Sequence, residues 1–212
     1  MSKNSNSETR PSYIKRVERI NPEKQLTGIL SKKFGQRFKD YRKEYFKILD
    51  NKNNNYDHVP DYPLNVLVEV VNKCNLECIM CLSSHRKGDT KVISNETISK
   101  LLTEFKENNL PALMFGAGDE PLMFSDIDQM WKEANLSGIM DIFIFTNGTL
   151  LNEDMCKKIL EHEVSRVYIS LDAATEETYQ KIRLTNKKIN EEVTGNQKLK
   201  IINEEQNSLQ SI

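Results

Sequence analysis

Short apolar runs alternate with stretches of helical spacing through most of the chain. The apolar runs predict strands buried on both faces, because they are almost continuously hydrophobic. These runs are LNVLVEVV (64–71), LPALMF (110–115), DIFIFT (141–146) and RVYISL (166–171). Each run is followed by a stretch in which apolar residues recur every three or four positions, which predicts a helix. These stretches are 93–109, 125–135, 152–161 and 175–183.

Four strand–helix units in series predict parallel strands joined by right-handed crossovers. A closed barrel needs more than four strands. We therefore expect an α/β fold in which the parallel strands form a partial (β/α) barrel with an exposed edge. After residue 183 the chain is charged and rich in Asn, and its apolar residues predict a helix broken near Gly195.

The segment before the first strand has a different pattern. Residues 21–51 carry aromatic and aliphatic residues every three or four positions, and Asn21 and Pro22 suit the start of a helix. This predicts one N-terminal amphipathic helix whose aromatic stripe packs against the domain that follows. The expected organisation is a disordered tail (1–20), the helix and an Asn- and Pro-rich linker (21–61), the core (62–205) and a polar tail (206–212).

The chemically unusual residues follow the predicted strands directly. CNLECIMC (74–81) comes after the first strand, GAGDEP (116–121) after the second and TNG (146–148) after the third, while SLD (170–172) closes the fourth. In barrels and open α/β sheets, ligands bind at the carboxyl ends of parallel strands. We therefore expect the four motifs to face one common site.

Composition narrows the range of partners. The 212 residues include 30 Lys and Arg against 31 Asp and Glu, for a net charge of -1, so no basic excess favours nucleic acid or an anionic membrane. No run approaches the roughly 20 apolar residues of a membrane span, and the start MSKNSNSETRPS lacks a signal-peptide core. We expect a cytoplasmic protein, in which clustered cysteines serve metal binding or catalysis rather than disulfides.

Three of the four cysteines, Cys74, Cys78 and Cys81, form a C-x3-C-x2-C motif. A structural zinc site is one interpretation, with His85 as fourth ligand, although paired C-x2-C knuckles are absent. A ferredoxin-type cluster is a second, but its fourth ligand would be Cys156, which we expect to be a small core residue on a helix. The third is a [4Fe–4S] cluster with three protein ligands and an open iron that binds a small molecule and delivers an electron to it.

The motif resembles the cysteine signature of the radical S-adenosylmethionine (radical SAM) enzymes, and CNL…C.MC resembles their SPASM-associated branch. GDEP (118–121) resembles the family's glycine-glycine-glutamate-proline motif, and TNGTLL (146–151) resembles the segment after its third strand. YISLDAATEETYQKIR (168–183) resembles the fourth strand and the start of its helix. The resemblance covers roughly residues 62–205 and implies a TIM-barrel-like core, incomplete here because the family usually has about six βα units. It also implies that this chain is truncated after four units.

The resemblance implies that Cys74, Cys78 and Cys81 bind three irons of a [4Fe–4S] cluster while S-adenosylmethionine chelates the fourth. The reduced cluster would cleave that cofactor to a 5′-deoxyadenosyl radical, which abstracts hydrogen from a peptide, carbohydrate or other small-molecule substrate. A reductant such as flavodoxin or ferredoxin is the implied partner. Further cofactor contacts implied by family position are Met80 at the adenine, Gly118, Asp119 and Glu120 along the methionine amino group, Ser170 and Asp172 at the ribose, and Arg183 at the carboxylate.

Several of these positions have simpler interpretations. Ser170 and Asp172 could cap the following helix, and Arg183 could be a solvated residue on that helix. The Asn147–Gly148 pair could serve only as a turn former.

One residue departs from the family motif, and the missing units leave a second functional hypothesis. Asp119 replaces the second glycine of the motif, so its side chain would crowd the methionine end unless the loop between Gly116 and Gly118 shifts. The alternative function is a non-catalytic remnant that holds an iron–sulfur cluster or zinc and needs a partner or a missing C-terminal part.

Overall fold

A computed structural model of the chain describes residues 22–49, 59–85 and 88–185. The predicted tail 1–20, most of the linker, the break near Gly195 and the C-terminal tail lie outside the described residues.

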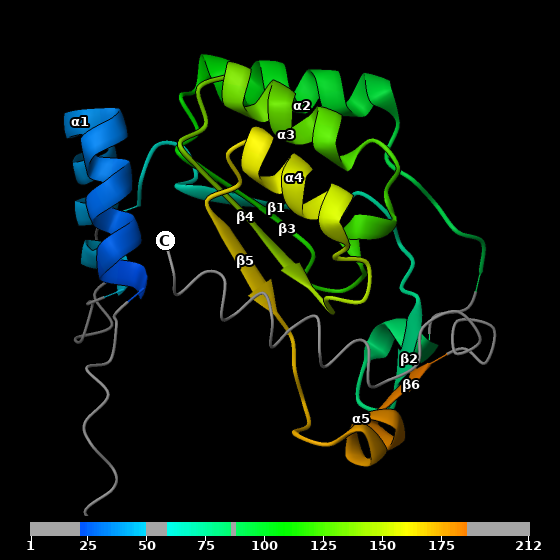
Figure 1. The fold of residues 1–212 in the computed structure, drawn as a ribbon. Helices are drawn as coiled ribbons and strands as arrows, with labels where there is room; N and C mark the ends of the chain where they lie inside the picture. Colours follow the sequence, from blue (N-terminus) through cyan, green and yellow to red (C-terminus); the bar gives the residue numbers. More distant parts are fainter. Residues whose placement is uncertain (1–21, 50–58, 86–87, 186–212) are drawn as a thin grey trace, which may run out of the picture.

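Four parallel strands form one open sheet in the order β1-β3-β4-β5 (Figure 1). The strands are β1 (Asn65–Val68), β3 (Ala112–Phe115), β4 (Asp141–Thr146) and β5 (Arg166–Ile169). Each is followed by a helix, so the predicted four strand–helix units are all present. The open sheet, with β1 and β5 at its edges, confirms the predicted partial barrel of parallel strands.

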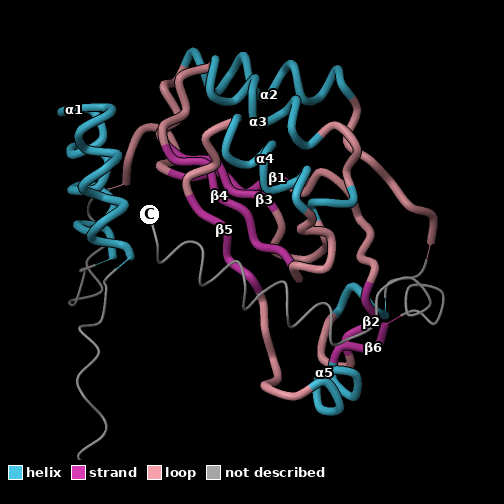
Figure 2. The backbone as a smooth tube through the Cα atoms, viewed as in Figure 1, coloured by secondary structure: helices cyan, strands magenta, loops and turns pink. Residues whose placement is uncertain are grey.

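Three helices cover one face of the sheet (Figures 1 and 2). They are α2 (Asn95–Glu107), α3 (Ile127–Leu136) and α4 (Glu153–Glu161). The predicted cap of α2 is confirmed, since the Ser94 side chain accepts a hydrogen bond from the backbone N–H of Thr97. All three helices begin and end within a few residues of their predicted positions.

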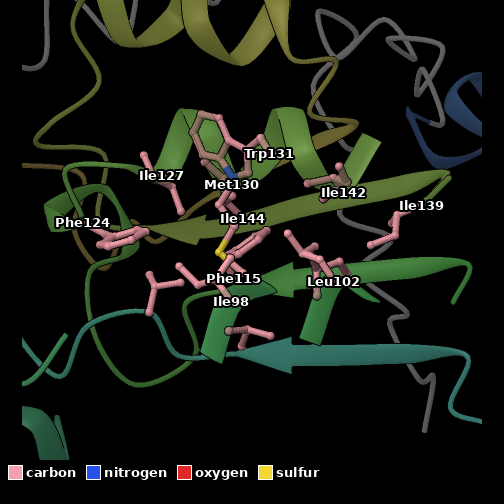
Figure 3. Packing of buried hydrophobic residues seen from close by; sticks show 14 of the residues in the cluster. Ile98, Leu102, Phe115, Phe124, Ile127, Met130, Trp131, Ile139, Ile142 and Ile144 are labelled. Carbon is pink, nitrogen blue, oxygen red and sulfur yellow. The ribbon is translucent and has the colours of Figure 1, made fainter. Parts of the chain in front are cut away.

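The main core lies between these helices and the sheet (Figure 3). Trp131 of α3 is fully buried, and it lies in one cluster with Phe115 of β3 and Ile144 of β4. Because side chains alternate along a strand, Phe143 and Phe145 of β4 lie on the opposite face. There the ring of Phe145 stacks on Tyr168 of β5 at 4.7 Å between centroids.

The N-terminal helix α1 (Pro22–Leu49) packs at the amino ends of the strands, away from the motifs. Its fully buried Phe38 lies in a cluster with Ala112, which begins β3, and Met140, which precedes β4. The predicted packing of the aromatic stripe is therefore confirmed. The prediction of one uninterrupted helix is wrong, because Gly35 has φ 63° and ψ -136° and divides α1 into two helical segments.

A group of charged side chains also joins α1 to the sheet. The carboxylate of Asp141, fully buried in β4, pairs with Arg166 of β5 at 2.9 Å. Arg166 lies 3.5 Å from Glu23 of α1, which pairs in turn with the buried Arg42 at 2.5 Å. Buried charges of this kind are costly to leave without a partner, so these pairs favour one position of α1 on the sheet.

A second, two-stranded sheet was not predicted. In it β2 (Leu76–Cys78) pairs antiparallel with β6 (Arg183–Thr185), which follows α5 (Glu176–Ile182). Two short 3-10 helices, η1 (Leu82–His85) and η2 (Pro121–Met123), complete the described elements. None of the described helices combines the length and the apolar character that crossing a membrane requires.

The packing of α1 can be tested with two phenylalanines of the same helix. We expect Phe38→Ala to lower the free energy of unfolding by about 3–5 kcal/mol, because a fully buried ring is lost. Phe46 is 47% exposed, and Phe46→Ala should cost less than about 1 kcal/mol. Urea denaturation of both variants gives the two values. Equal losses would show that α1 does not pack on the sheet as described.

Candidate functional site

The cysteine motif forms a tight turn that begins in β2. Cys78 ends β2, and its carbonyl oxygen accepts hydrogen bonds from the backbone N–H of Cys81 at 3.0 Å and from the Ser84 hydroxyl at 2.8 Å. On its other side β2 pairs with β6, where Cys78 lies opposite Arg183. These bonds hold the turn that carries Cys78 and Cys81, while Cys74 lies two residues before β2.

The loop after β3 contacts this turn. The Sγ atom of Cys81 lies 4.0 Å from the carbonyl oxygen of Gly118. The hydroxyl of Ser83 donates a hydrogen bond to the carboxylate of Asp119. Asp119, the residue that departs from the family motif, thus ties its loop to the cysteine turn through its side chain.

Glu120 joins three of the strand-end loops. Its backbone N–H donates to the carbonyl oxygen of Lys73, just before the cysteine motif, at 3.0 Å. Glu120 is only 2% exposed, and its carboxylate accepts hydrogen bonds from the Thr146 hydroxyl at 2.7 Å and from the backbone N–H of Asn147 at 2.8 Å. The backbone N–H of Leu122 also donates to it, at 3.2 Å. Burial raises the pKa of Glu120, while these donors and the charge of Arg183 lower it.

Asn147 is bonded to the cysteine motif as well as to Glu120. Its side-chain amide Nδ2 lies 3.7 Å from Cys74 Sγ and 2.8 Å from Asn75 Oδ1. The next residue, Gly148, has φ 76°, so the predicted turn is confirmed. Sequence reasoning gave Asn147 no further role, because an Asn-Gly pair is a common turn former by itself.

The segment after β5 brings together Asp172 and Arg183. The Nε atom of Arg183 donates to Asp172 Oδ2 at 2.6 Å, and Arg183 is buried. The interpretation of Arg183 as a solvated helix residue is therefore wrong, since it begins β6 and lies beside Cys78. Burial raises the pKa of the Cys78 thiol, and the guanidinium charge of Arg183 acts in the opposite direction.

The predicted capping roles of this segment are also wrong. The residue that caps α5 is Thr175, whose hydroxyl accepts from the backbone N–H of Thr178. Ser170 is exposed, and its backbone N–H donates to the carbonyl oxygen of Thr146 at 2.9 Å, which places it beside the end of β4. Met80 lies in the turn after β2 and is 58% exposed.

Glu69 is a site residue that sequence reasoning missed. One of its carboxylate oxygens accepts hydrogen bonds from the backbone N–H groups of Ala117 at 3.2 Å and Gly118 at 2.9 Å. The available signal was its position as the single acid within VLVEVV, between Val68 and Val70, which are buried in the core. By alternation Glu69 lies on the opposite face, at the end of the sheet where the motifs gather.

The side chains in the described part of the chain are not gathered around one point as a single metal ion would require. Among the described residues, no three His, Cys, Asp or Glu side chains are arranged to hold one metal ion. A single zinc ion draws its sulfur ligands to about 2.3 Å from one point, whereas a cluster of four irons is wider and takes each thiolate on a different iron. The side chain of His85, the fourth ligand in the zinc interpretation, lies outside the described residues.

Cys74 is a free thiol that is partly buried. Burial raises the pKa of the Cys74 thiol, with hydrogen bonds from Leu76 and Asn147 acting in the opposite direction. Metal binding must therefore displace protons from Cys74 and Cys78.

Cys156 lies on α4 and is only half-buried, so it is not the buried core residue that was expected.

Comparison with known proteins finds a matching protein-family model and several curated relatives. The protein-family model described as the radical SAM superfamily matches residues 68–204. The chain is 32% identical over 116 residues to 7,8-dihydro-6-hydroxymethylpterin dimethyltransferase of Methanocaldococcus jannaschii, covering 53% of this chain and 23% of that protein. It is 30% identical over 131 residues to GTP 3',8-cyclase of Limosilactobacillus fermentum, covering 60% of this chain and 38% of that protein.

A solved structure shares the fold. The crystal structure of BtrN in complex with AdoMet and 2-DOIA superposes with a TM-score of 0.51 at 18% identity, covering 66% of this chain and 55% of that chain. The chain thus spans well under half the length of the two curated relatives and about half that of the solved structure.

Gly116, at the end of β3, supplies a test of the loop geometry. Its φ is 76°, and a Cβ atom there would lie 2.5 Å from the carbonyl oxygen of Phe145. We expect Gly116→Ala to lower the free energy of unfolding by about 2–5 kcal/mol, from backbone strain and overpacking. Gly28 in α1 has nothing within 4 Å of such an atom, so Gly28→Ala should leave stability unchanged or raise it. Thermal unfolding compares them, and an equally stable Gly116→Ala would contradict the described loop.

The buried carboxylate of Glu120 supplies a second test. In Glu120→Gln one acceptor oxygen becomes an NH₂ group that faces a donor, so we expect a loss of about 1–3 kcal/mol in the free energy of unfolding. Glu69→Gln is the matched control, because one oxygen accepts both of its hydrogen bonds and a Gln oxygen can replace it. Urea denaturation at pH 7 measures both variants. A loss for Glu69→Gln as large as that for Glu120→Gln would argue against the special position of Glu120.

Proposed function

This chain belongs to the radical SAM superfamily, and we propose that Cys74, Cys78 and Cys81 hold a [4Fe–4S] cluster beside a bound S-adenosylmethionine. The observation that carries the proposal is the position of the cysteine turn. Cys81 lies against the Gly118 loop after β3, and Cys74 lies against Asn147 after β4. The three thiols therefore stand at the carboxyl end of the parallel sheet, where barrel enzymes bind their ligands.

When bound, the cluster supplies an electron that splits S-adenosylmethionine and begins radical chemistry on a substrate. The residues of the chain would bind and orient the cofactor. Gly118 and Asp119 would offer backbone carbonyl groups to its amino group, and Glu120 would add a carboxylate that is already held by the loops after β3 and β4. Arg183 bonds Asp172 through Nε, and its Nη atoms suit a carboxylate of the cofactor.

Further contacts follow from the position of the remaining residues. Ser170, beside the end of β4, and Asp172 are proposed for the ribose, and the exposed Met80 for the adenine. Asp119 need not crowd the cofactor, because its side chain is directed to Ser83. The substitution for the motif glycine is therefore compatible with binding.

The substrate is proposed to be a peptide, a carbohydrate or another small molecule. The face of the sheet opposite the three helices carries Phe143, Phe145 and Tyr168, so it offers aromatic surface to a substrate. A one-electron reductant such as flavodoxin or ferredoxin is the proposed partner. A cytoplasmic location is part of the proposal, because reducing conditions keep the three thiols free to bind iron.

A second candidate is a non-catalytic protein that holds a cluster or zinc. The observation that favours it is the open edge of the sheet at β5, where Tyr168 and Ile169 are 40% and 43% exposed. An open sheet encloses a substrate less completely than a closed barrel does. Such a protein would bind metal without turnover unless a partner covered this edge.

Metal content and cofactor cleavage together test the proposal. After anaerobic reconstitution, the wild-type chain should bind about four irons and form 5′-deoxyadenosine from S-adenosylmethionine only when dithionite is present. Cys78→Ala should lose both properties, because one of the three iron ligands is gone. Cys156→Ala, on the half-buried α4 position, should keep both.

The outcomes separate the two candidates. Iron without 5′-deoxyadenosine, or zinc without iron, would favour the non-catalytic protein. Cleavage retained by Cys78→Ala would overturn the assignment of the cluster ligands.

A further inference from the structure

We propose that Asn147 is a positioning residue for Cys74, whose sulfur it binds through an N–H···S hydrogen bond that raises the reduction potential of the cluster. The inference rests on the proposed function, since it takes Cys74 to be a cluster ligand. It adds a residue outside the cysteine motif that acts on the cluster through one of its ligands. The amide nitrogen Nδ2 lies 3.7 Å from Cys74 Sγ.

The orientation of the Asn147 amide is decided by its neighbours. Its Oδ1 atom accepts hydrogen bonds from the backbone N–H of Thr149 at 2.9 Å and from the Thr149 hydroxyl at 2.6 Å. A backbone N–H can only donate, so the atom facing it must be the amide oxygen. The NH₂ group is consequently the one turned toward Cys74.

Three side chains form a closed ring of hydrogen bonds. Asn147 Nδ2 donates to Asn75 Oδ1 at 2.8 Å, Asn75 Nδ2 donates to the Thr149 hydroxyl at 2.7 Å, and that hydroxyl donates back to Asn147. The backbone N–H of Asn147 is held separately by the carboxylate of Glu120 at 2.8 Å. Chains of hydrogen bonds strengthen one another, so the second NH₂ hydrogen is held toward the sulfur before any metal binds.

Cys74 and Cys81 differ in the hydrogen-bonding groups that face their sulfur atoms. Cys74 Sγ also accepts a hydrogen bond from the backbone N–H of Leu76 at 3.4 Å, so two N–H donors point at this sulfur. Cys81 Sγ instead faces the carbonyl oxygen of Gly118 at 4.0 Å, which is an acceptor. Cys74 is therefore better placed than Cys81 to take on negative charge.

Reduction adds one negative charge to a cluster, and part of that charge resides on its thiolate ligands. A hydrogen-bond donor aimed at a ligand sulfur stabilises the reduced state more than the oxidised one. Asn147 is thus expected to make the cluster easier to reduce. Removing its NH₂ group should make the reduction potential more negative.

Two variants of Asn147 test this. Asn147→Leu removes the donor, and Asn147→Asp keeps the shape and the acceptor for Thr149 but turns a carboxylate oxygen toward Cys74. For Asn147→Leu, the ratio of reduced to oxidised cluster at a fixed potential should fall by about tenfold, which corresponds to about 59 mV for one electron. The fall should be larger for Asn147→Asp, because it adds negative charge.

The control is Asn152→Asp, which adds the same charge at the start of α4, where an Asp can replace the Asn152 cap. It should leave the potential unchanged. The measurement is a redox titration of the anaerobically reconstituted chain followed by electron paramagnetic resonance, with iron content and melting temperature determined on the same samples. A role in folding alone would change melting temperature without changing the potential of the loaded fraction.

The outcomes are separable. Unchanged or more positive potentials in loaded Asn147→Leu and Asn147→Asp would overturn the proposal. If Asn147→Leu fails to bind iron, the isosteric Asn147→Asp decides the question. A wild-type chain that assembles no cluster would instead overturn the proposed function.

Discussion

Glu120 buries its carboxylate where the loops after β3 and β4 meet the base of the cysteine motif. Its backbone N–H binds Lys73, and its side chain binds Thr146, Asn147 and Leu122. A buried carboxylate is costly unless donors surround it, and here the donors come from separate loops. The hydrogen bonds that stabilise the buried carboxylate therefore also bring together loops that are distant in the sequence. Asn147, bonded through its backbone to Glu120, carries the connection on to Cys74.

The two ends of the sheet perform different physical tasks. At the amino ends, Phe38 and the buried pair of Asp141 and Arg166 attach α1, where packing and charge pairing stabilise the fold. At the carboxyl ends, Gly116 and Gly148 both adopt positive φ, and the loops carry polar groups directed at one another. Glycines at positive φ and buried polar groups occur at the second end, where they let the motif loops approach one another closely.

The strand–helix order was predictable because each apolar run is long enough to be distinctive and α2 has a recognisable cap in Ser94. The divided α1 was not, because Gly35 interrupts the helix without interrupting its apolar spacing. Nor was the β2–β6 pair predictable, because its two strands are short and its pairing depends on residues distant in sequence. Arg183 was misplaced for the same reason: the periodicity of α5 continues up to it, but the chain there turns into β6.

The sequence by itself determined the chemistry of the candidate site. The spacing of Cys74, Cys78 and Cys81 and the order of the motifs after four apolar runs are local properties, and each strand places its motif at the same end of the sheet. Only the tertiary structure decided which groups act on those thiols. The contacts of Asn147 with Cys74, of Asp119 with Ser83 and of Glu69 with the Gly118 loop each join residues from different strand ends. Such bonds depend on distances set by the packing of the sheet, which no local pattern specifies.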